Sequence, residues 1–399
     1  MIPIHQSNSI HYLLGDNKLS IRPLIPYDPL LCNFLEELSS ELRSSPETAR
    51  YPDIIAFAFW CRKANILKLK EIFEDNKIRL GLGLAFHIAP SNVPINFAFS
   101  FAFALLAGNA NIVRVPSKSF LQVDLVCHAI DKLLENEKYK EIKTMTAFVR
   151  YEQNDQITGD FSASCNARII WGGDESIRNI RQLPIPERSI EIAFSDRYSF
   201  CMIDAPSILK LQEEELKRLT ENFYNDTYLM DQNACSSPHL IVWQGEEKEK
   251  AKQRFWTALS KIVVGKYPLA PVHAVDKYAL LCRDAIALNN IQYFKQEGVH
   301  IYRIGFNRLP LEMSSFRGKY GYFYEYDMEK ESDISPIINK KYQTLTYFGI
   351  DKALLQNFVL ENRLTGIDRI VPVGQALDIG PIWDGYDVVK SLSRIIDVR

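Results

Sequence analysis

The sequence contains no Cys-x-x-Cys pair. Its 399 residues include seven cysteines, and their spacing matches neither a disulfide framework nor a zinc-binding motif. They stand at positions 32, 61, 127, 165, 201, 235 and 282. Reduced thiols are typical of proteins from a reducing compartment. We therefore predict a cytoplasmic protein without a metal site, and the remaining question is whether one of these cysteines does chemistry.

An excess of charge of one sign is also lacking. The chain has 47 Lys and Arg against 49 Asp and Glu, which gives a formal net charge of −2 at pH 7. This balance argues against binding to nucleic acid or to an anionic membrane through overall charge. Hydrophobic residues make up 47% and charged residues 24%, as in ordinary globular proteins. The composition therefore predicts a folded protein without a nucleic-acid partner.

No apolar run is long enough to cross a membrane. The most apolar stretch, 93–107, reads VPINFAFSFAFALLA, and a spanning helix needs about 20 apolar residues. Pro94 and Asn96 also interrupt its beginning. The first residues lack the basic, apolar and cleavage regions of a signal peptide. We expect 93–107 to form a buried helix and expect no transmembrane segment.

Strand-like and helix-like segments alternate in the first half of the chain. The strand-like runs are rich in apolar and β-branched residues, and segments with helical apolar spacing separate them. They lie at 80–89, 110–115 and 167–171. This order predicts an α/β fold with parallel sheets covered by helices on both faces. The second half repeats such units, with no flexible linker between them.

Two pairs of glycines could mark a phosphate-binding turn. Gly81 and Gly83 precede a strand-like run and lack the third glycine of a dinucleotide-binding loop, so they favour strand or turn geometry. Gly172 and Gly173 follow a strand-like run and precede an acidic helix start. Backbone N–H groups at such a start can bind phosphate. An ordinary turn explains the second pair equally well, so both interpretations stay open.

Basic and hydroxyl side chains follow the run at 110–115. Arg114 is followed by Pro116, Ser117 and Lys118, and then by a helix-like segment. In an open α/β sheet, ligands bind at the carboxyl ends of the strands. Arginine and lysine there would suit a phosphate group. A solvated basic turn is the alternative interpretation.

Cys235 differs from the other cysteines in its surroundings. It lies among small polar residues in the segment 231–239, DQNACSSPH, whereas most of the others lie in apolar segments. A nucleophilic cysteine needs donors or positive potential nearby, and a turn leading into a helix would supply both. His239 lies four residues further on and is a candidate base. A structural hydrogen bond or simple exposure explains His239 as well.

Three segments together resemble one family. The runs 81–119, 231–239 and 366–387 are similar, in order and separation, to the LuxC-type acyl-CoA reductases, a branch of the aldehyde dehydrogenase superfamily. The resemblance extends from about Tyr51 to Val398. It implies an aldehyde dehydrogenase-like α/β fold with two packed three-layer domains and parallel-type sheets.

The resemblance also divides the chain by role. It implies a cofactor-binding, Rossmann-like domain at 1–204, completed by 370–399, and a catalytic domain at 205–369 that carries the nucleophile. It implies that Cys235 is this nucleophile.

A Pro-x-Asn turn lies near the reacting carbon in the superfamily, and Pro90-Ser91-Asn92 resembles it. The resemblance implies that the side-chain amide of Asn92 and the backbone N–H of Cys235 form the oxyanion hole.

The cofactor is implied in the same way. The adenosine side of a nicotinamide cofactor corresponds to the turn from Arg114 to Lys118, and the pyrophosphate to Gly172 and Gly173. Superfamily members that prefer NAD often carry a glutamate near the position of Lys118. Because lysine and arginine attract a 2′-phosphate, we predict NADPH (NADP) rather than NADH.

Glu191 stands where hydrolytic superfamily members carry the glutamate that activates water. The glycine pair that follows this glutamate in those members is missing here, because Ala193 and Phe194 take its place. A thioester reductase does not need to activate water. Glu191 is therefore either a proton carrier or a structural residue.

The function implied is NADPH-dependent reduction of a long-chain fatty acyl-CoA, or of a related acyl-protein thioester, to the aldehyde through an acyl-cysteine. A homo-oligomer and an acyl-supplying partner enzyme are compatible with it. Two alternatives stay open: an NAD(P)-dependent aldehyde dehydrogenase that forms the acid, and an acyl-transfer or scaffold subunit of a fatty acid reductase complex.

Overall fold

The computed structural model describes residues 10–90 and 93–399, and these form two compact units. Unit 1 contains Met1–Ser195 and Tyr386–Arg399, and unit 2 contains Asp196–Gly385. The sequence places the corresponding boundaries at 204 and 370. The roles assigned to the two units stay predictions.

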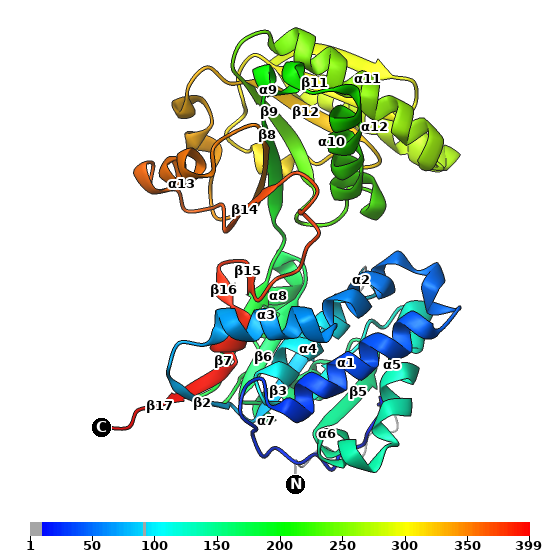
Figure 1. Ribbon diagram of the computed structural model, residues 1–399, viewed down its shortest axis with the longest axis vertical. Helices are drawn as coiled ribbons and strands as arrows, with labels where there is room; N and C mark the ends of the chain where they lie inside the picture. Colours follow the sequence, from blue (N-terminus) through cyan, green and yellow to red (C-terminus); the bar gives the residue numbers. More distant parts are fainter. Residues whose placement is uncertain (1–9, 91–92) are drawn as a thin grey trace. The chain divides into compact units, whose positions relative to one another are not determined.

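Unit 1 is built around a six-stranded sheet in the order β1-β5-β4-β3-β6-β7 (Figure 1). β1 is antiparallel to its neighbour, and the other pairs are parallel. The strands are β1 His11–Leu14, β3 Leu84–Ile88, β4 Ala110–Arg114, β5 Thr146–Arg150, β6 Ala167–Trp171 and β7 Ile190–Phe194. A separate antiparallel pair joins β2 Ile78–Gly81 to β17 Ser393–Ile396, so the last residues return to this unit.

Helices cover both faces of this sheet. α7 and α8 pack their apolar residues against β3 and β4 on one face, and α4 packs on the other. The helices are α1 Pro29–Ser44, α2 Pro52–Trp60, α3 Lys63–Phe73, α4 Asn96–Leu106, α5 Leu121–Leu134, α6 Lys140–Thr144, α7 Asp155–Ser164, α8 Asp174–Arg181 and α14 Val388–Ser391, with the short strand β16 Tyr386–Asp387 before the last.

The buried helix expected at 93–107 is confirmed. Every residue of α4 from Phe97 to Leu106 is buried. The strand expected at 80–89 is instead two strands, β2 and β3. Gly83 lies in the turn between them with φ of +129°, a conformation open to glycine but rarely adopted by other residues. This agrees with the turn geometry predicted for Gly83.

Unit 2 is built around a seven-stranded sheet in the order β10-β11-β12-β9-β8-β13-β14. Only β10 at the edge is antiparallel. The strands are β8 Tyr198–Asp204, β9 Pro238–Gln244, β10 Ile291–Glu297, β11 Ile301–Phe306, β12 Tyr322–Asp327, β13 Tyr342–Phe348, β14 Arg369–Pro372 and the short β15 Ile382–Trp383. The helices are α9 Ala205–Lys210, α10 Glu213–Thr227, α11 Lys248–Lys266, α12 Pro271–Ala287 and α13 Lys352–Glu361.

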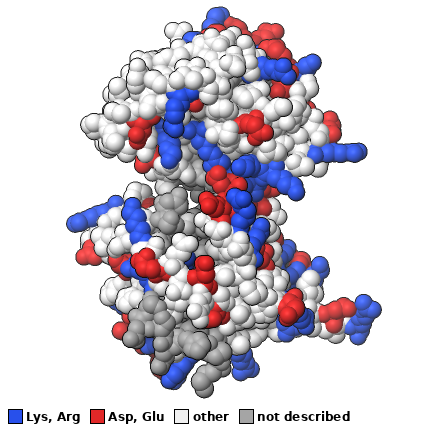
Figure 2. All heavy atoms as spheres, turned by 180° about the vertical axis from the view of Figure 1, so that it is seen from behind, with Lys and Arg blue, Asp and Glu red and all other residues white. Residues whose placement is uncertain are grey.

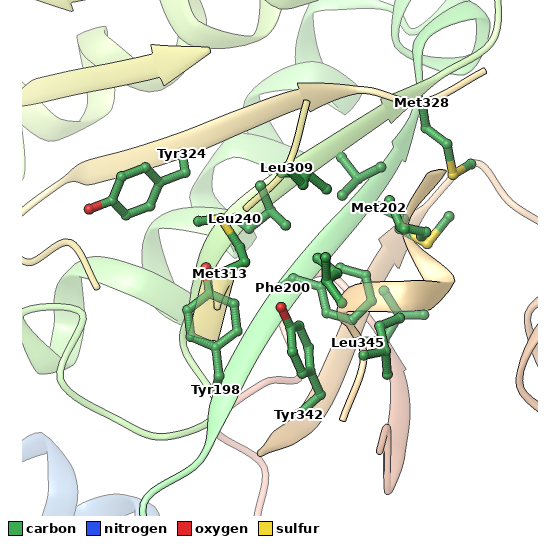
Figure 3. Packing of buried hydrophobic residues seen from close by; sticks show 14 of the residues in the cluster. Tyr198, Phe200, Met202, Leu240, Leu309, Met313, Tyr324, Met328, Tyr342 and Leu345 are labelled. Atoms are coloured by element: carbon green, nitrogen blue, oxygen red, sulfur yellow. The ribbon is translucent and has the colours of Figure 1, made fainter. Parts of the chain in front are cut away.

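The second sheet also separates two apolar cores. On one face, α10 and α11 pack against Cys201, Ile203 and Ile241. On the other face, Phe200, Met202, Leu240 and other residues form the cluster drawn in Figure 3. Each unit therefore has three layers, helix, sheet and helix, with a mostly parallel sheet.

The surface agrees with the near-zero net charge. Basic and acidic side chains both occur on the face shown in Figure 2. Within residues 10–90 and 93–399, no helix combines the length and apolar character needed to span a bilayer.

Candidate active site

Cys235 lies in a loop between a 3₁₀ turn, Tyr228–Met230, and the beginning of β9 at Pro238. Asp231 and Gln232 in this loop both have left-handed backbone, with φ of +52° and +60°. Consecutive non-glycine residues in this region are costly and persist only where the surroundings hold them. The loop is therefore a strained segment with strong local supports.

Gln232 is the main support. Its side chain is buried and donates to the carbonyls of Pro238 and Tyr322, at 3.1 Å each. Its Oε1 accepts the backbone N–H groups of Gly321 and Tyr322, at 3.2 and 3.3 Å. This one side chain joins the loop to the beginning of β12.

Two serines hold the loop on its other side. Ser199 Oγ donates to the carbonyl of Cys235 at 2.7 Å, and Ser237 Oγ donates to the carbonyl of Asp226 at 2.7 Å. Because no helix follows Cys235, the expectation that a helix N-terminus supplies its positive potential is wrong. The small polar residues instead make a turn that leads into the strand β9.

Side chains from other elements surround the thiol. Gln343 Nε2, on β13, donates to Cys235 Sγ at 3.5 Å and also to Asp384 Oδ1. Asp384 forms an ion pair with Arg197 Nη1 at 3.8 Å. The thiol therefore accepts from an amide whose other partner is a carboxylate, and this carboxylate is paired with a guanidinium, all within unit 2.

These groups act on the ionisation of Cys235 in opposite directions. Exclusion of water and then the charge of Asp384 raise the pKa of its thiol to about 11. Gln343, Arg197 and Arg317 oppose this rise, because a donor or a cation stabilises the thiolate. At neutral pH the resting sulfur is mainly protonated.

The remaining cysteines lack such an arrangement. Burial raises the pKa of the Cys165 and Cys201 thiols to about 12. Cys61, at the C-cap of α2, and Cys127, on α5, are also buried. Cys32 donates to the carbonyl of Tyr27 at 3.5 Å, and Cys282 is exposed on α12.

His239 is buried in β9 and stacks on the ring of Tyr198, with centroids 5.4 Å apart. Desolvation, then the charge of Arg317, lowers its pKa to about 3, so its ring stays neutral. Within the described residues, its Nδ1 has no hydrogen-bond partner and no hydrogen bond joins it to Cys235. These contacts favour a packing role over that of a direct base.

The turn expected to supply the oxyanion donor is described only in part. Pro90 is half-buried just after β3. Ser91 and Asn92 lie outside the described residues. The roles of all three stay predictions.

Arg114 ends β4, at the carboxyl edge of the unit 1 sheet. Its guanidinium lies 4.5 Å from the ring centroid of Tyr151 and donates to the carbonyl of that residue at 3.4 Å. Its Nε is buried and has no hydrogen-bond partner in the described part of the chain. Pro116 is buried, whereas Ser117 and Lys118 are exposed.

Gly172 and Gly173 connect β6 to α8 as expected for a strand-to-helix turn. Gly173 is the N-cap residue of α8 and has no side chain with which to cap this end. A Cβ at Gly173 would meet no atom of the described residues within 4 Å. Asp174 and Glu175 in the first turn reduce its attraction for anions.

Arg114 Nε, which has no partner among the described residues, and the start of α8 lie at the carboxyl ends of β4 and β6, the strands on either side of β3. Donors at the carboxyl edge of a parallel sheet suit a dinucleotide. The residues present therefore fit a nicotinamide cofactor.

Glu191 lies on β7 and both its carboxylate oxygens are engaged. Oε2 accepts from Arg168 Nε at 2.9 Å and Nη2 at 2.5 Å, and Oε1 accepts from Arg181 Nε at 2.6 Å. Phe194, in place of the second glycine, stacks on Trp171 with centroids 3.9 Å apart. Of the two interpretations left open for Glu191, these contacts favour the structural one.

Sequence reasoning missed Gln343, Asp384 and Arg197. Gln343 is a single amide in a strand of aromatic residues, threonines and one leucine, and nothing in its neighbourhood marks it. Asp384 belongs to the C-terminal run that carries the family resemblance, and Asp384-Gly385 is a turn signal. The pairing of these residues with Cys235 is visible only in the fold.

Solved structures of aldehyde dehydrogenases share this fold. An oxidoreductase from Marinobacter aquaeolei has a TM-score of 0.67 at 12% identity, over 94% of this chain and 87% of that one. An NAD-dependent benzaldehyde dehydrogenase from Corynebacterium glutamicum has a TM-score of 0.62 at 12% identity, over 93% of this chain and 85% of that one. A salicylaldehyde dehydrogenase from Pseudomonas putida G7 has a TM-score of 0.62 at 12% identity, over 94% of this chain and 85% of that one.

No curated protein matches the chain in sequence. The family described as acyl-CoA reductase (LuxC) matches residues 70–395, most of the chain. This family and the fold together imply an oxidoreductase that acts on acyl or aldehyde substrates with a nicotinamide cofactor. The chain belongs to the acyl-CoA reductase (LuxC) family and has the aldehyde dehydrogenase fold.

Proposed function

We propose that the chain reduces a long-chain fatty acyl-CoA, or a related acyl thioester, to the aldehyde with NADPH, through an acyl group on Cys235. The observation that carries this proposal is the environment of Cys235. Its loop is strained and tightly supported, and its sulfur meets the Gln343 amide and lies near three arginines that include Arg197 and Arg317. The other cysteines have no such environment.

The acylation step follows from the chemistry of sulfur. The Cys235 thiolate attacks the carbonyl carbon of the thioester, and a new carbon–sulfur bond forms. The bond to the CoA sulfur breaks, and that sulfur leaves with the electron pair and takes up the proton lost by Cys235. Asn92 and the backbone N–H of Cys235 donate to the oxygen that becomes negative. Each such donor stabilises a transition state by roughly 3–4 kcal/mol.

A bound reduced nicotinamide supplies the hydride for the acyl carbon. Arg114 and Lys118 hold the phosphate side of the cofactor, and the start of α8 holds its pyrophosphate. The cationic charge of Lys118 favours NADPH, because a 2′-phosphate gains an ion pair there. When the aldehyde leaves, the electron pair returns to the Cys235 sulfur.

The acid-forming alternative needs a residue that activates water. Glu191 is the candidate from the superfamily pattern, but its two oxygens accept from Arg168 and Arg181. A carboxylate engaged in this way is a poor base, which supports the reductase. A purely structural subunit is disfavoured because it would not need the thiol environment of Cys235.

The cellular setting is also a proposal. The seven cysteines are free thiols, which supports a cytoplasmic location. We propose a homo-oligomer that receives acyl groups from CoA or from an acyl-supplying partner enzyme.

The test is to incubate the protein with a fatty acyl-CoA in the absence of cofactor and to digest it for mass spectrometry. We expect the acyl mass on the peptide that carries Cys235, and no adduct in Cys235→Ala. Cys282→Ala is the matched control and should keep the adduct. An acyl group on a different cysteine, or full aldehyde formation by Cys235→Ala, would contradict the proposal.

A second assay separates the two enzymatic alternatives. A panel of acyl thioesters is tested with NADPH and with NADH, and cofactor absorbance is followed. Thioester-dependent oxidation of NADPH supports the reductase. Formation of acid from aldehyde without CoA would support the aldehyde dehydrogenase instead.

A further inference from the structure

The side-chain amide of Gln343 uses both of its N–H groups at once. One hydrogen bond reaches Cys235 Sγ at 3.5 Å, and the other reaches Asp384 Oδ1. The amide oxygen accepts from Thr344 Oγ1 at 3.2 Å. Because an ionised carboxylate can only accept, Asp384 requires the NH₂ end of the amide to face it and the sulfur. The orientation of Gln343 is therefore determined by its other partners.

Asp384 is a buried carboxylate with an unusual backbone conformation. It is 8% exposed, and its φ of +49° lies in the left-handed region, which aspartate tolerates better than most residues. Its partners are the Gln343 amide and Arg197, which it shares with Asp368. Its negative charge is only partly neutralised, and it acts on the sulfur of Cys235.

Three arginines supply the opposite charge around the sulfur. Arg197, Arg317 and Arg369 all interact electrostatically with Cys235. Each is also engaged elsewhere. Arg317 pairs with Asp196 at 2.7 Å, and Arg369 donates to backbone carbonyls, including that of Ala376 at 3.0 Å. The charges that face the thiol are thus one carboxylate and three partly compensated cations.

We propose that Gln343 and Asp384 act as an opposed pair that sets the ionisation of Cys235. Gln343 is a positioning residue that aims the sulfur and stabilises the thiolate through its N–H. Asp384 fixes the amide in that orientation, while its charge favours the protonated thiol. This inference rests on the proposed role of Cys235 as the nucleophile.

The balance has a chemical use. A thiol that stays mostly protonated is protected from oxidation and from stray electrophiles, because the thiolate is the reactive form. Once ionised, a thiol of higher pKa is the stronger nucleophile. The pair therefore keeps the resting sulfur mostly inert, while the small ionised fraction is a strong nucleophile toward a bound thioester.

Alkylation by iodoacetamide tests the pair without substrate or cofactor. Asp384→Asn keeps an acceptor for Gln343 and tolerates positive φ, so it removes only the charge. We expect alkylation of the Cys235 peptide at neutral pH to become about threefold faster, because a thiol pKa lowered by one unit gives about ten times more thiolate of about threefold lower nucleophilicity. Gln343→Met removes the donor at similar volume, and we expect alkylation to slow by roughly threefold.

The pH dependence of alkylation gives the decisive readout. The midpoint should move to lower pH in Asp384→Asn and to higher pH in Gln343→Met, whereas a general loosening would speed alkylation in both. Exposed Cys282 is the reference in the same digest and should be unchanged. Asp351→Asn, which keeps the N-cap of α13, is the matched control for charge removal.

Equal midpoints in the wild type and Asp384→Asn would overturn the inference, as would shifts of both variants in one direction. Circular dichroism and urea unfolding check that each variant is folded. If only one variant folds, it still tests the role proposed for the residue that it replaces. Failure of the proposed function is seen separately, as the absence of an acyl adduct on wild-type Cys235.

Discussion

The carboxylate of Asp226 accepts the backbone N–H of Ala376 at 2.9 Å, although the two residues are 150 positions apart in the chain. Its second oxygen accepts the N–H of Gly374 at 2.6 Å. Asp226 lies on α10, and Gly374 and Ala376 lie in the segment that leads to Asp384. One buried carboxylate therefore anchors the segment that supplies a charge beside Cys235.

This anchor predicts a pH dependence of stability. Desolvation raises the pKa of Asp226 to about 7 in the folded protein, against 3.8 for an ordinary aspartate. The folded state therefore holds this proton more tightly than the unfolded state. The stabilisation is complete below about pH 4 and is lost as the pH rises through about 7, by at most ~4 kcal/mol.

Urea unfolding of the wild type and of Asp226→Asn across this range measures the effect. The wild type should lose unfolding free energy relative to the variant as the pH rises from 4 to 7, because the variant cannot ionise. Parallel curves for the two proteins would show that Asp226 has an ordinary pKa.

The loop of Cys235 should depend on Gln232. Gln232→Ala leaves the backbone groups of Pro238, Gly321 and Tyr322 without their partners in a buried place. We expect a loss of roughly 3 kcal/mol in unfolding free energy and slower acylation of Cys235, because the strained loop is no longer held. Urea unfolding and the rate of adduct formation measure the two effects. Asn233→Ala, at an exposed neighbour, should change neither by as much.

Cofactor preference should depend on Lys118. Lys118→Glu replaces the cation by a carboxylate, which repels a 2′-phosphate and can bind a ribose hydroxyl. We expect the ratio of kcat/KM for NADPH over NADH to fall by roughly tenfold, equivalent to about 1.4 kcal/mol. Lys143→Glu, at another exposed lysine, is the control and should leave the ratio unchanged. An unchanged ratio in Lys118→Glu would remove the basis for predicting NADPH.

Glu191 should matter for folding and not for water activation. Glu191→Ala leaves the buried guanidinium of Arg168 without its carboxylate, and we expect a loss of about 3 kcal/mol in unfolding free energy. The acyl group on Cys235 should hydrolyse at the wild-type rate, followed by mass spectrometry without cofactor. Slower hydrolysis would show that Glu191 activates water. Glu187→Ala, at an exposed carboxylate nearby, is the matched control.

The local parts of the fold could be predicted from the sequence. The apolar run that became α4 and the β-branched run that became β4 are recognisable because burial on all sides selects apolar residues at every position. The division of 80–89 into two strands is harder to predict. The chain turns at Gly83 because this glycine has a positive φ, and a single glycine in a sequence only suggests such a turn.

The candidate site was predictable only in part. Its small polar neighbours distinguish Cys235 from the other cysteines, but the same neighbours predict a helix start where the chain makes a turn into a strand. Gln232 gave no signal, because glutamine is not a residue that typically adopts left-handed backbone. Gln343 and Asp384 stand 108 and 149 positions after Cys235, and only the parallel pairing of distant strands brings the first of them to the sulfur.

The residues around Cys235 are synthesised at different times. On the ribosome, Cys235 is made well before Gln343 and Asp384, and a growing chain that ends between them has the thiol without its donor or its restraining charge. Unit 2 completes its sheet only when β13 and β14 have been added. The surroundings that set the ionisation of the cysteine are therefore completed late in translation, when the C-terminal segment closes beside it.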